Sequence, residues 1–158
     1  MQWKGGTIKM KAIWFDMDGT IADLYKVENW LEDLHAYNPR PYKNARPLVN
    51  MQVLARILNK LRKEGFTINI VSWTSKQATN EYAEKVAQTK RAWLKKHLRS
   101  VVFDKIDILP YGAPKGHNRE GILFDDESAN RIEWMKKETN IAFSERYIIE
   151  VLRAIQST

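Results

Sequence analysis

The chain has 158 residues, of which 44% are hydrophobic, and it contains no cysteine. This length and composition indicate a single packed domain without disulfides, thiolate metal ligands or a cysteine nucleophile. The formal net charge of +7 favours polyanionic or phosphorylated partners, whereas the lack of a long apolar run leads us to expect a cytoplasmic protein with no membrane partner.

Strands and helices are predicted to alternate from the first apolar run onward. Residues 1–9 are expected to form a loose extension, after which the run that ends at Phe15 predicts a buried strand. Residues 21–47 carry three prolines and many aromatic side chains and are expected to be irregular. Apolar residues at helical spacing predict a helix over residues 48–64 that ends at Gly65.

The second half of the chain continues this alternation. Thr74 and Gln77 have the spacing of a capping box and indicate the start of a long helix. The remaining expected elements are strands over 66–71, 105–109, 121–124 and 140–143, and helices over 74–98, 127–137 and 144–155. Because strands that alternate with helices form right-handed crossovers, the sequence predicts an α/β fold with a three-layer, Rossmann-like arrangement and a mostly parallel sheet.

Two aspartates, Asp16 and Asp18, come directly after the first predicted strand. The carboxyl end of a strand is where open α/β sheets bind ligands. An extended backbone would turn Met17 toward the core and both carboxylates the same way. Because two ionised carboxylates so close repel each other, they need a cation or a proton between them. The alternative is a turn-forming pair ahead of Gly19.

Polar residues also end two other predicted strands. Ser72 and Thr74 follow the second strand, and Asp125 and Asp126 follow the fourth; a parallel sheet brings such ends to one edge. Lys115 lies in the loop before the fourth strand and is expected to reach the same edge. Oxygen ligands without nearby histidine or cysteine favour Mg²⁺. The pattern predicts phosphoryl transfer at a magnesium site.

These residues resemble the four motifs of the haloacid dehalogenase-like superfamily of phosphohydrolases. The first motif stands here as Asp16-Met17-Asp18-Gly19-Thr20 after an apolar strand, and the second as an apolar strand that ends in Ser72. Lys115 and the pair Asp125-Asp126 match the third and fourth motifs. A weaker similarity, to the 5′(3′)-deoxyribonucleotidases, rests on Lys90-Arg91-Ala92-Trp93 in the middle helix and on the spacing between Lys115 and Asp125.

The resemblance implies a catalytic role for four of these residues. Asp16 would attack phosphorus and form an acyl phosphate, and Asp18 would serve as general acid and then as general base. Lys115 would neutralise charge on Asp16 and on the phosphoryl group. Ser72 would donate a hydrogen bond to a phosphoryl oxygen.

Two of these roles have alternatives within the sequence. Thr74 competes with Ser72 for the phosphoryl contact, since both lie near the end of the second strand. Lys90 competes with Lys115, because it lies beside the apolar stripe of the middle helix and could point inward.

Four aspartates are the expected Mg²⁺ ligands: Asp16, Asp18, Asp125 and Asp126. The resemblance favours Asp126 as the direct ligand of the second pair and leaves Asp125 to hold a metal-bound water or Lys115. An acidic helix N-terminus is the alternative interpretation of that pair. The histidines lack metal-ligand spacing and are expected to be structural or surface residues: His35, His97 and His117.

Three residues are expected to contact the substrate: Thr20, Trp73 and Thr74. Thr20 would also orient Asp16, and Trp73 would form a wall of the substrate site. Residues 21–47 occupy the place where the superfamily inserts a cap over its active site, and the short insert indicates an open site. Its aromatic side chains could stack on a base or form a small core of their own.

The sequence therefore predicts a Mg²⁺-dependent phosphatase that acts on a small phosphomonoester, with a (deoxy)nucleoside monophosphate as a candidate substrate. Two alternatives keep the same fold. One is a phosphatase acting on phosphorylated nucleic-acid ends, for which the basic residues over 85–99 would provide a contact surface. The other is a non-catalytic module that binds phosphate or nucleic acid.

Overall fold

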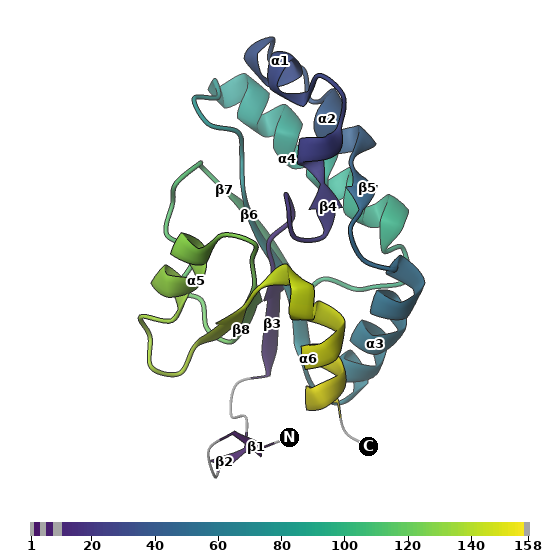
Figure 1. The fold of residues 1–158 in the computed structure, drawn as a ribbon, viewed down its shortest axis with the longest axis vertical. Helices are drawn as coiled ribbons and strands as arrows, with labels where there is room; N and C mark the ends of the chain where they lie inside the picture. The colour runs from purple at the N-terminus through teal and green to yellow at the C-terminus, as the bar shows by residue number, and fades with distance from the viewer. Residues whose placement is uncertain (1, 4–5, 8–10, 157–158) are drawn as a thin grey trace.

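A computed structural model of the chain describes residues 2–3, 6–7 and 11–156. Its centre is one sheet of five parallel strands in the order β7-β6-β3-β8-β9 (Figure 1). The strands are β3 (Ala12–Phe15), β6 (Thr67–Trp73), β7 (Lys105–Leu109), β8 (Ile122–Phe124) and β9 (Ile141–Phe143). This arrangement confirms the expected α/β class and the parallel sheet.

Helices cover both faces of this sheet (Figure 1). Helices α3 (Met51–Lys63) and α6 (Ile148–Ile155) contact each other on one face, together with the second half of α4 (Asn80–His97). Helix α5 (Ser128–Trp134) packs against β8 and β9 on the other face. The molecule therefore has three layers.

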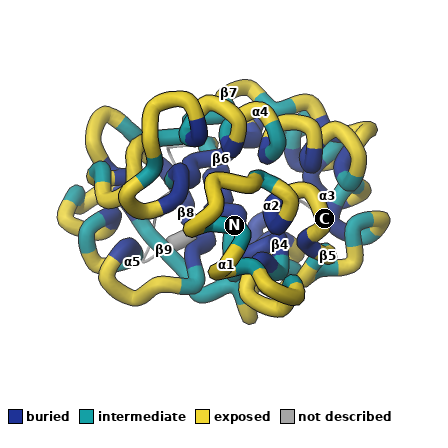
Figure 2. Tube along the Cα trace, turned by 90° about the horizontal axis from the view of Figure 1, so that it is seen from above, coloured by how far each residue is buried: buried dark blue, intermediate teal, exposed yellow. Residues whose placement is uncertain are grey.

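Side chains that alternate along β3 supply both halves of the core. Ile13 and Phe15 belong to the large apolar cluster under α3 and α6, whereas Trp14 points to the opposite face, as the period of two in a strand requires. There Trp14 meets Trp134 of α5 edge to face, with ring centroids 6.1 Å apart. Figure 2 shows buried positions gathered in the interior and exposed positions on the outer helices. This double-sided burial explains why β3 is apolar throughout.

The segment over residues 21–47 is ordered, and the expectation of an irregular segment is wrong. Its elements are β4 (Ala22–Asp23), the 3₁₀ helix η1 (Leu24–Lys26), α1 (Trp30–His35), α2 (Arg40–Asn44) and β5 (Arg46–Pro47). The two helices are too short for their apolar spacing to show in the sequence, and Pro41 lies in the first turn of α2, where proline is tolerated. Strand β4 pairs with β5 and closes the base of this insert.

The insert packs on the first half of α4. Leu24 and Tyr42 of the insert form a small apolar cluster with Tyr82 and Val86 of α4, and the Tyr82 hydroxyl donates a hydrogen bond to the carbonyl of Asn38. The insert is therefore held above the carboxyl edge of the sheet, as Figure 1 shows.

Several element boundaries differ from the expected ones. Helix α4 begins at Asn80 rather than near Thr74, because Thr79 is its N-cap and accepts a hydrogen bond from the amide of Tyr82. The Thr74 amide instead bonds to the carbonyl of Leu109, which prolongs the strand ladder past β6. The chain from residue 74 to residue 79 is thereby free to line a cavity.

Smaller differences occur near both ends of the chain. The last helix is preceded by a 3₁₀ turn, η2 (Glu145–Tyr147). Within the expected extension over residues 1–9, β1 (Gln2–Trp3) and β2 (Gly6–Thr7) pair antiparallel; the rest of that extension lies outside the described residues. In the described part of the chain, none of the helices combines the length and apolar character needed to cross a membrane.

Candidate active site

A tight loop follows β3 and fixes the direction of Asp16. The Asp16 amide donates to the carbonyl of Phe124, which ties the loop to β8. The carbonyl of Met17 accepts hydrogen bonds from the amides of residues 20, 21 and 22, at 2.9–3.0 Å, and the Met17 side chain is buried in the core as expected. The Asp16 carboxylate is thus held nearly buried at the carboxyl edge of the sheet.

Gly19 makes room in this loop for the carboxylate of Asp126. Its φ is +81°, a left-handed conformation that favours glycine. A Cβ atom at this position would lie only 2.3 Å from Asp126 Oδ2 and 2.8 Å from its Cγ. The missing side chain therefore lets the loop after β3 and the loop after β8 approach each other.

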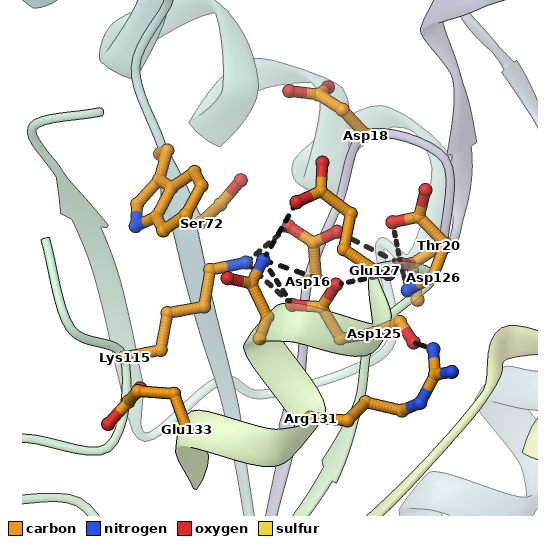
Figure 3. Close-up of polar contacts among 12 residues, drawn as sticks. Asp16, Asp18, Thr20, Ser72, Lys115, Asp125, Asp126, Glu127, Arg131 and Glu133 are labelled. Carbon is orange, nitrogen blue, oxygen red and sulfur yellow. Dashed lines mark hydrogen bonds and ion pairs between the residues drawn. The ribbon is translucent and has the colours of Figure 1, made fainter. Parts of the chain in front are cut away.

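Lys115 bridges two of the aspartates. Its Nζ lies 3.0 Å from Asp16 Oδ1 and 2.7 Å from Asp125 Oδ2 (Figure 3), and the side chain is almost fully buried. Burial alone would lower the pKa of Lys115, but the charges of Asp16 and Asp125 outweigh it and raise the pKa. The structure therefore brings together the lysine and the aspartates named from the sequence.

Thr20 contacts the aspartates rather than the cavity. Its hydroxyl lies 2.9 Å from Asp16 Oδ2 and 3.1 Å from Asp126 Oδ1, and it accepts a hydrogen bond from the Asp126 amide. The contact with Asp16 agrees with the expectation that Thr20 orients that aspartate. Thr20 itself is fully buried and is not among the residues that line the cavity.

Three carboxylates form a possible metal site. One oxygen from each of Asp16, Asp125 and Asp126 lies within 4.8 Å of the others. Burial, followed by the charge of Asp16, raises the pKa of Asp125 to about 6 and that of Asp126 to about 8. A divalent cation would relieve this repulsion, and a set of carboxylate oxygens suits Mg²⁺. The donor set therefore fits the expected ion.

Asp18, the fourth carboxylate expected at the metal, lies apart from this group of three. Its Oδ2 lies 2.7 Å from Nζ of Lys90 on α4, and Figure 3 shows its carboxylate directed away from the other aspartates. Burial raises the pKa of Asp18, and the charge of Lys90 opposes that rise. Asp18 still lines the same cavity as Asp16.

The two candidates at the end of β6 occupy different places. Ser72 is fully buried, and its hydroxyl accepts a hydrogen bond from Lys90 Nζ at 2.8 Å. Thr74 lines the cavity, whereas Ser72 is absent from its walls. The sequence pattern ended the apolar run at Ser72, but the strand ladder continues to Thr74, and this extension decides which side chain reaches the cavity.

A cavity of about 290 Å³ opens above Asp16. Trp73 and Tyr111 form one wall, with ring centroids 5.0 Å apart, and the Trp73 indole is fixed by a 2.8 Å hydrogen bond to the carbonyl of Ala113. Trp73 therefore lies where the sequence interpretation placed it, beside the cavity. The insert contributes a mostly apolar part of the lining: Leu24, Tyr25, Trp30, Leu31, Leu34 and Tyr42.

Sequence reasoning missed or undervalued several residues of this site. Glu127 and Asn130 follow β8 and line the cavity, and Asn130 Nδ2 also approaches Asp125 Oδ2 at 3.3 Å. His35, expected to be structural or on the surface, is exposed and lines the cavity rim. Lys90 carried a usable signal, a lysine beside an apolar helical stripe, but its partner lies 72 residues away in the sequence.

Asp16, Lys115 and Thr74 thus line the cavity, and the carboxylates of Asp125 and Asp126 lie close to that of Asp16. Such a set can hold a divalent cation and place a phosphoryl group beside Asp16. No protein-family model matches this chain, and no curated protein matches it significantly.

Proposed function

We propose that this protein is a Mg²⁺-dependent phosphohydrolase that forms an aspartyl phosphate on Asp16. The observation that carries the proposal is the meeting of four charged side chains beside one cavity. Asp16 and Lys115 line that cavity, Asp125 contacts Lys115, and carboxylate oxygens of Asp125 and Asp126 lie within 4.8 Å of one of Asp16. A nucleophilic carboxylate beside a buried cation suits attack on a phosphomonoester. The resemblance of these residues to the motifs of the haloacid dehalogenase-like superfamily supports the same reaction.

The reaction has two steps. In the first, an oxygen of Asp16 forms a bond to phosphorus while the bond between phosphorus and the leaving oxygen breaks; Asp18 gives its proton to that oxygen. In the second, water attacks the phosphorus of the acyl phosphate, Asp18 takes the proton of the water, and the bond to Asp16 breaks. Phosphate leaves, and both aspartates return to their starting states.

The remaining residues stabilise charge. Lys115 offsets the negative charge on Asp16, and Thr74 is better placed than Ser72 to donate a hydrogen bond to the phosphoryl group. When bound, Mg²⁺ would neutralise carboxylate and phosphoryl oxygens. Asp126 is the favoured direct ligand, because Asp125 is already engaged by Lys115 and by the Glu127 amide.

The cavity favours a small substrate with an aromatic or apolar leaving group. Its volume of about 290 Å³ lies at the lower end of ligand pockets. The Trp73–Tyr111 pair and the aromatic insert form two walls that suit a flat ring. A (deoxy)nucleoside monophosphate is a candidate, whereas a polymer would have to present only its phosphorylated end.

A phosphatase panel tests this proposal. The wild-type protein and Asp16→Asn are assayed on nucleoside monophosphates, sugar phosphates, 4-nitrophenyl phosphate and oligonucleotides phosphorylated at either end, with Mg²⁺ or with EDTA. We expect Mg²⁺-dependent turnover by the wild type and none by a folded Asp16→Asn variant. Full activity of that variant would refute the covalent mechanism, and inactivity of the wild type on every substrate would favour a binding module. Preference for oligonucleotides would favour the nucleic-acid alternative.

A further inference from the structure

Lys90 is a buried lysine that joins three parts of the structure. It extends from α4, and only 1% of the residue is exposed. Its Nζ contacts Asp18 Oδ2 at 2.7 Å, Ser72 Oγ at 2.8 Å and the carbonyl of Trp73 at 2.7 Å. These contacts use all three donors of an ammonium group. Lys90 therefore ties the loop after β3 to the end of β6.

Asp18 depends on this lysine for its orientation. The contact with Lys90 is the only side-chain hydrogen bond of Asp18 among the described residues, and it occupies Oδ2 alone. The side chain keeps 19% of its surface exposed and lies on the cavity wall. Oδ2 is thus anchored, and Oδ1 makes no hydrogen bond to another side chain in the described part of the chain.

We propose that Lys90 is a positioning residue, which anchors one oxygen of Asp18 so that the other is presented to the leaving oxygen of the substrate and later to the attacking water. The proposal rests on the proposed function, since it needs Asp18 as the acid and base. Lys90 itself touches none of the reacting atoms. Its Nζ also lies 5.2 Å from the ring centre of Tyr42, so α2 of the insert covers the same anchor.

A purely structural lysine would act differently. Loss of a buried ion pair that only supports the fold would lower activity on every phosphomonoester to a similar extent. Loss of an anchor for Asp18 slows the transfer of its proton. The first step then slows most when the leaving oxygen is a strong base, as in an alkyl phosphate. It slows least for 4-nitrophenyl phosphate, whose leaving group needs no proton.

The experiment compares kcat/KM on these two substrates in Lys90→Met. We expect the loss on the alkyl phosphate to exceed that on the aryl phosphate by about tenfold or more, which is part of the roughly 10²–10⁴-fold that a positioned acid contributes. Lys85→Met is the matched control, because Lys85 lies exposed on the same helix and should leave the ratio unchanged. In an Asp18→Asn background, Lys90→Met should change neither rate further.

A second variant covers the case in which Lys90→Met fails to fold. Ser72→Ala removes one acceptor of the Lys90 ammonium and keeps the charge pair, so we expect a smaller shift of the ratio in the same direction. If a folded variant loses kcat/KM equally on both substrates, so that their ratio is unchanged, the positioning role of Lys90 is overturned. The proposed function would still hold in that case, provided that the wild-type protein is active. A wild-type protein without Mg²⁺-dependent turnover would instead refute the function itself.

Discussion

Gly19→Ala tests whether the carboxylate of Asp126 needs the space that the missing side chain of Gly19 leaves in the loop after β3. The added Cβ would lie 2.3 Å from Asp126 Oδ2, well inside van der Waals contact. The carboxylate of Asp126 must then move away from Asp16, or the loop must open. Either response separates one of the three carboxylates that lie within 4.8 Å of one another.

Two costs can be estimated for this variant. Alanine at a φ of +81° costs about 1–2 kcal/mol, which lowers Tm by about 2–4 °C per kcal/mol in a chain of this size. The clash with the new Cβ lowers stability, whereas moving the Asp126 carboxylate away from Asp16 relieves the repulsion between them. The stability of the metal-free protein is therefore a poor measure of how far Asp126 has moved. The metal response is direct: we expect Mg²⁺ affinity to fall by about 10–100-fold.

The assay is thermal unfolding with EDTA and with a Mg²⁺ titration, supported by calorimetry. Gly112→Ala is the matched control, because Gly112 has a φ of +87° and its Cβ would meet nothing within 4 Å. Both variants should lose stability in EDTA, but only Gly19→Ala should lose the gain in Tm on adding Mg²⁺. If the two variants respond to Mg²⁺ alike, the steric reasoning about Asp126 is wrong.

Three further outcomes are expected. The pKa values of Asp125 and Asp126, about 6 and about 8, lie above the unfolded value of about 3.9; the Mg²⁺-free protein should therefore lose stability as pH rises from about 4 to about 8. In urea titrations at a series of pH values, Mg²⁺ or Asp126→Asn should reduce this dependence of the free energy of unfolding on pH. A Tm in EDTA that rises with pH over the same range would contradict the prediction. Lys115→Met should destabilise the protein by about 3–5 kcal/mol, since it leaves buried carboxylates unpaired, and should lower turnover by about 10²–10³-fold. The exposed control Lys105→Met should do neither, and equal behaviour of the two variants would exclude a special role for the buried lysine. Trp73→Phe removes the indole hydrogen bond at the cavity wall, so steady-state kinetics should show a higher KM with kcat little changed; an unaltered KM would place the substrate elsewhere.

The sequence predicted the parts of the fold that depend on local patterns. A central parallel strand is apolar on both faces, so the runs that became β3 and β6 stood out, and Gly65 marked the end of α3. Because parallel strands share one edge, the positions of Asp16 and Asp125 followed from the strand ends. Their catalytic roles stay predictions.

The parts that escaped prediction depend on contacts between distant residues. The helices of the insert have six and five residues and owe their stability to packing on α4 rather than to their own periodicity. Asp18 was expected to face the same way as Asp16, but the ion pair with Lys90 turned it aside. No local rule links those two positions, so neither the orientation of Asp18 nor the burial of Ser72 could be read from spacing.

The bridge between the two acidic loops has a consequence for folding. Lys115 is 99 residues from Asp16, and Thr20 is 106 residues from Asp126, so the site forms only after β3 and β8 have paired. Contacts of such separation form late, because long loops must close first. A ligand that binds only the finished site stabilises the complete fold by mass action. Mg²⁺ binding would therefore report whether newly made chains have reached their final topology, and partly folded chains that lack β8 would escape its stabilising effect.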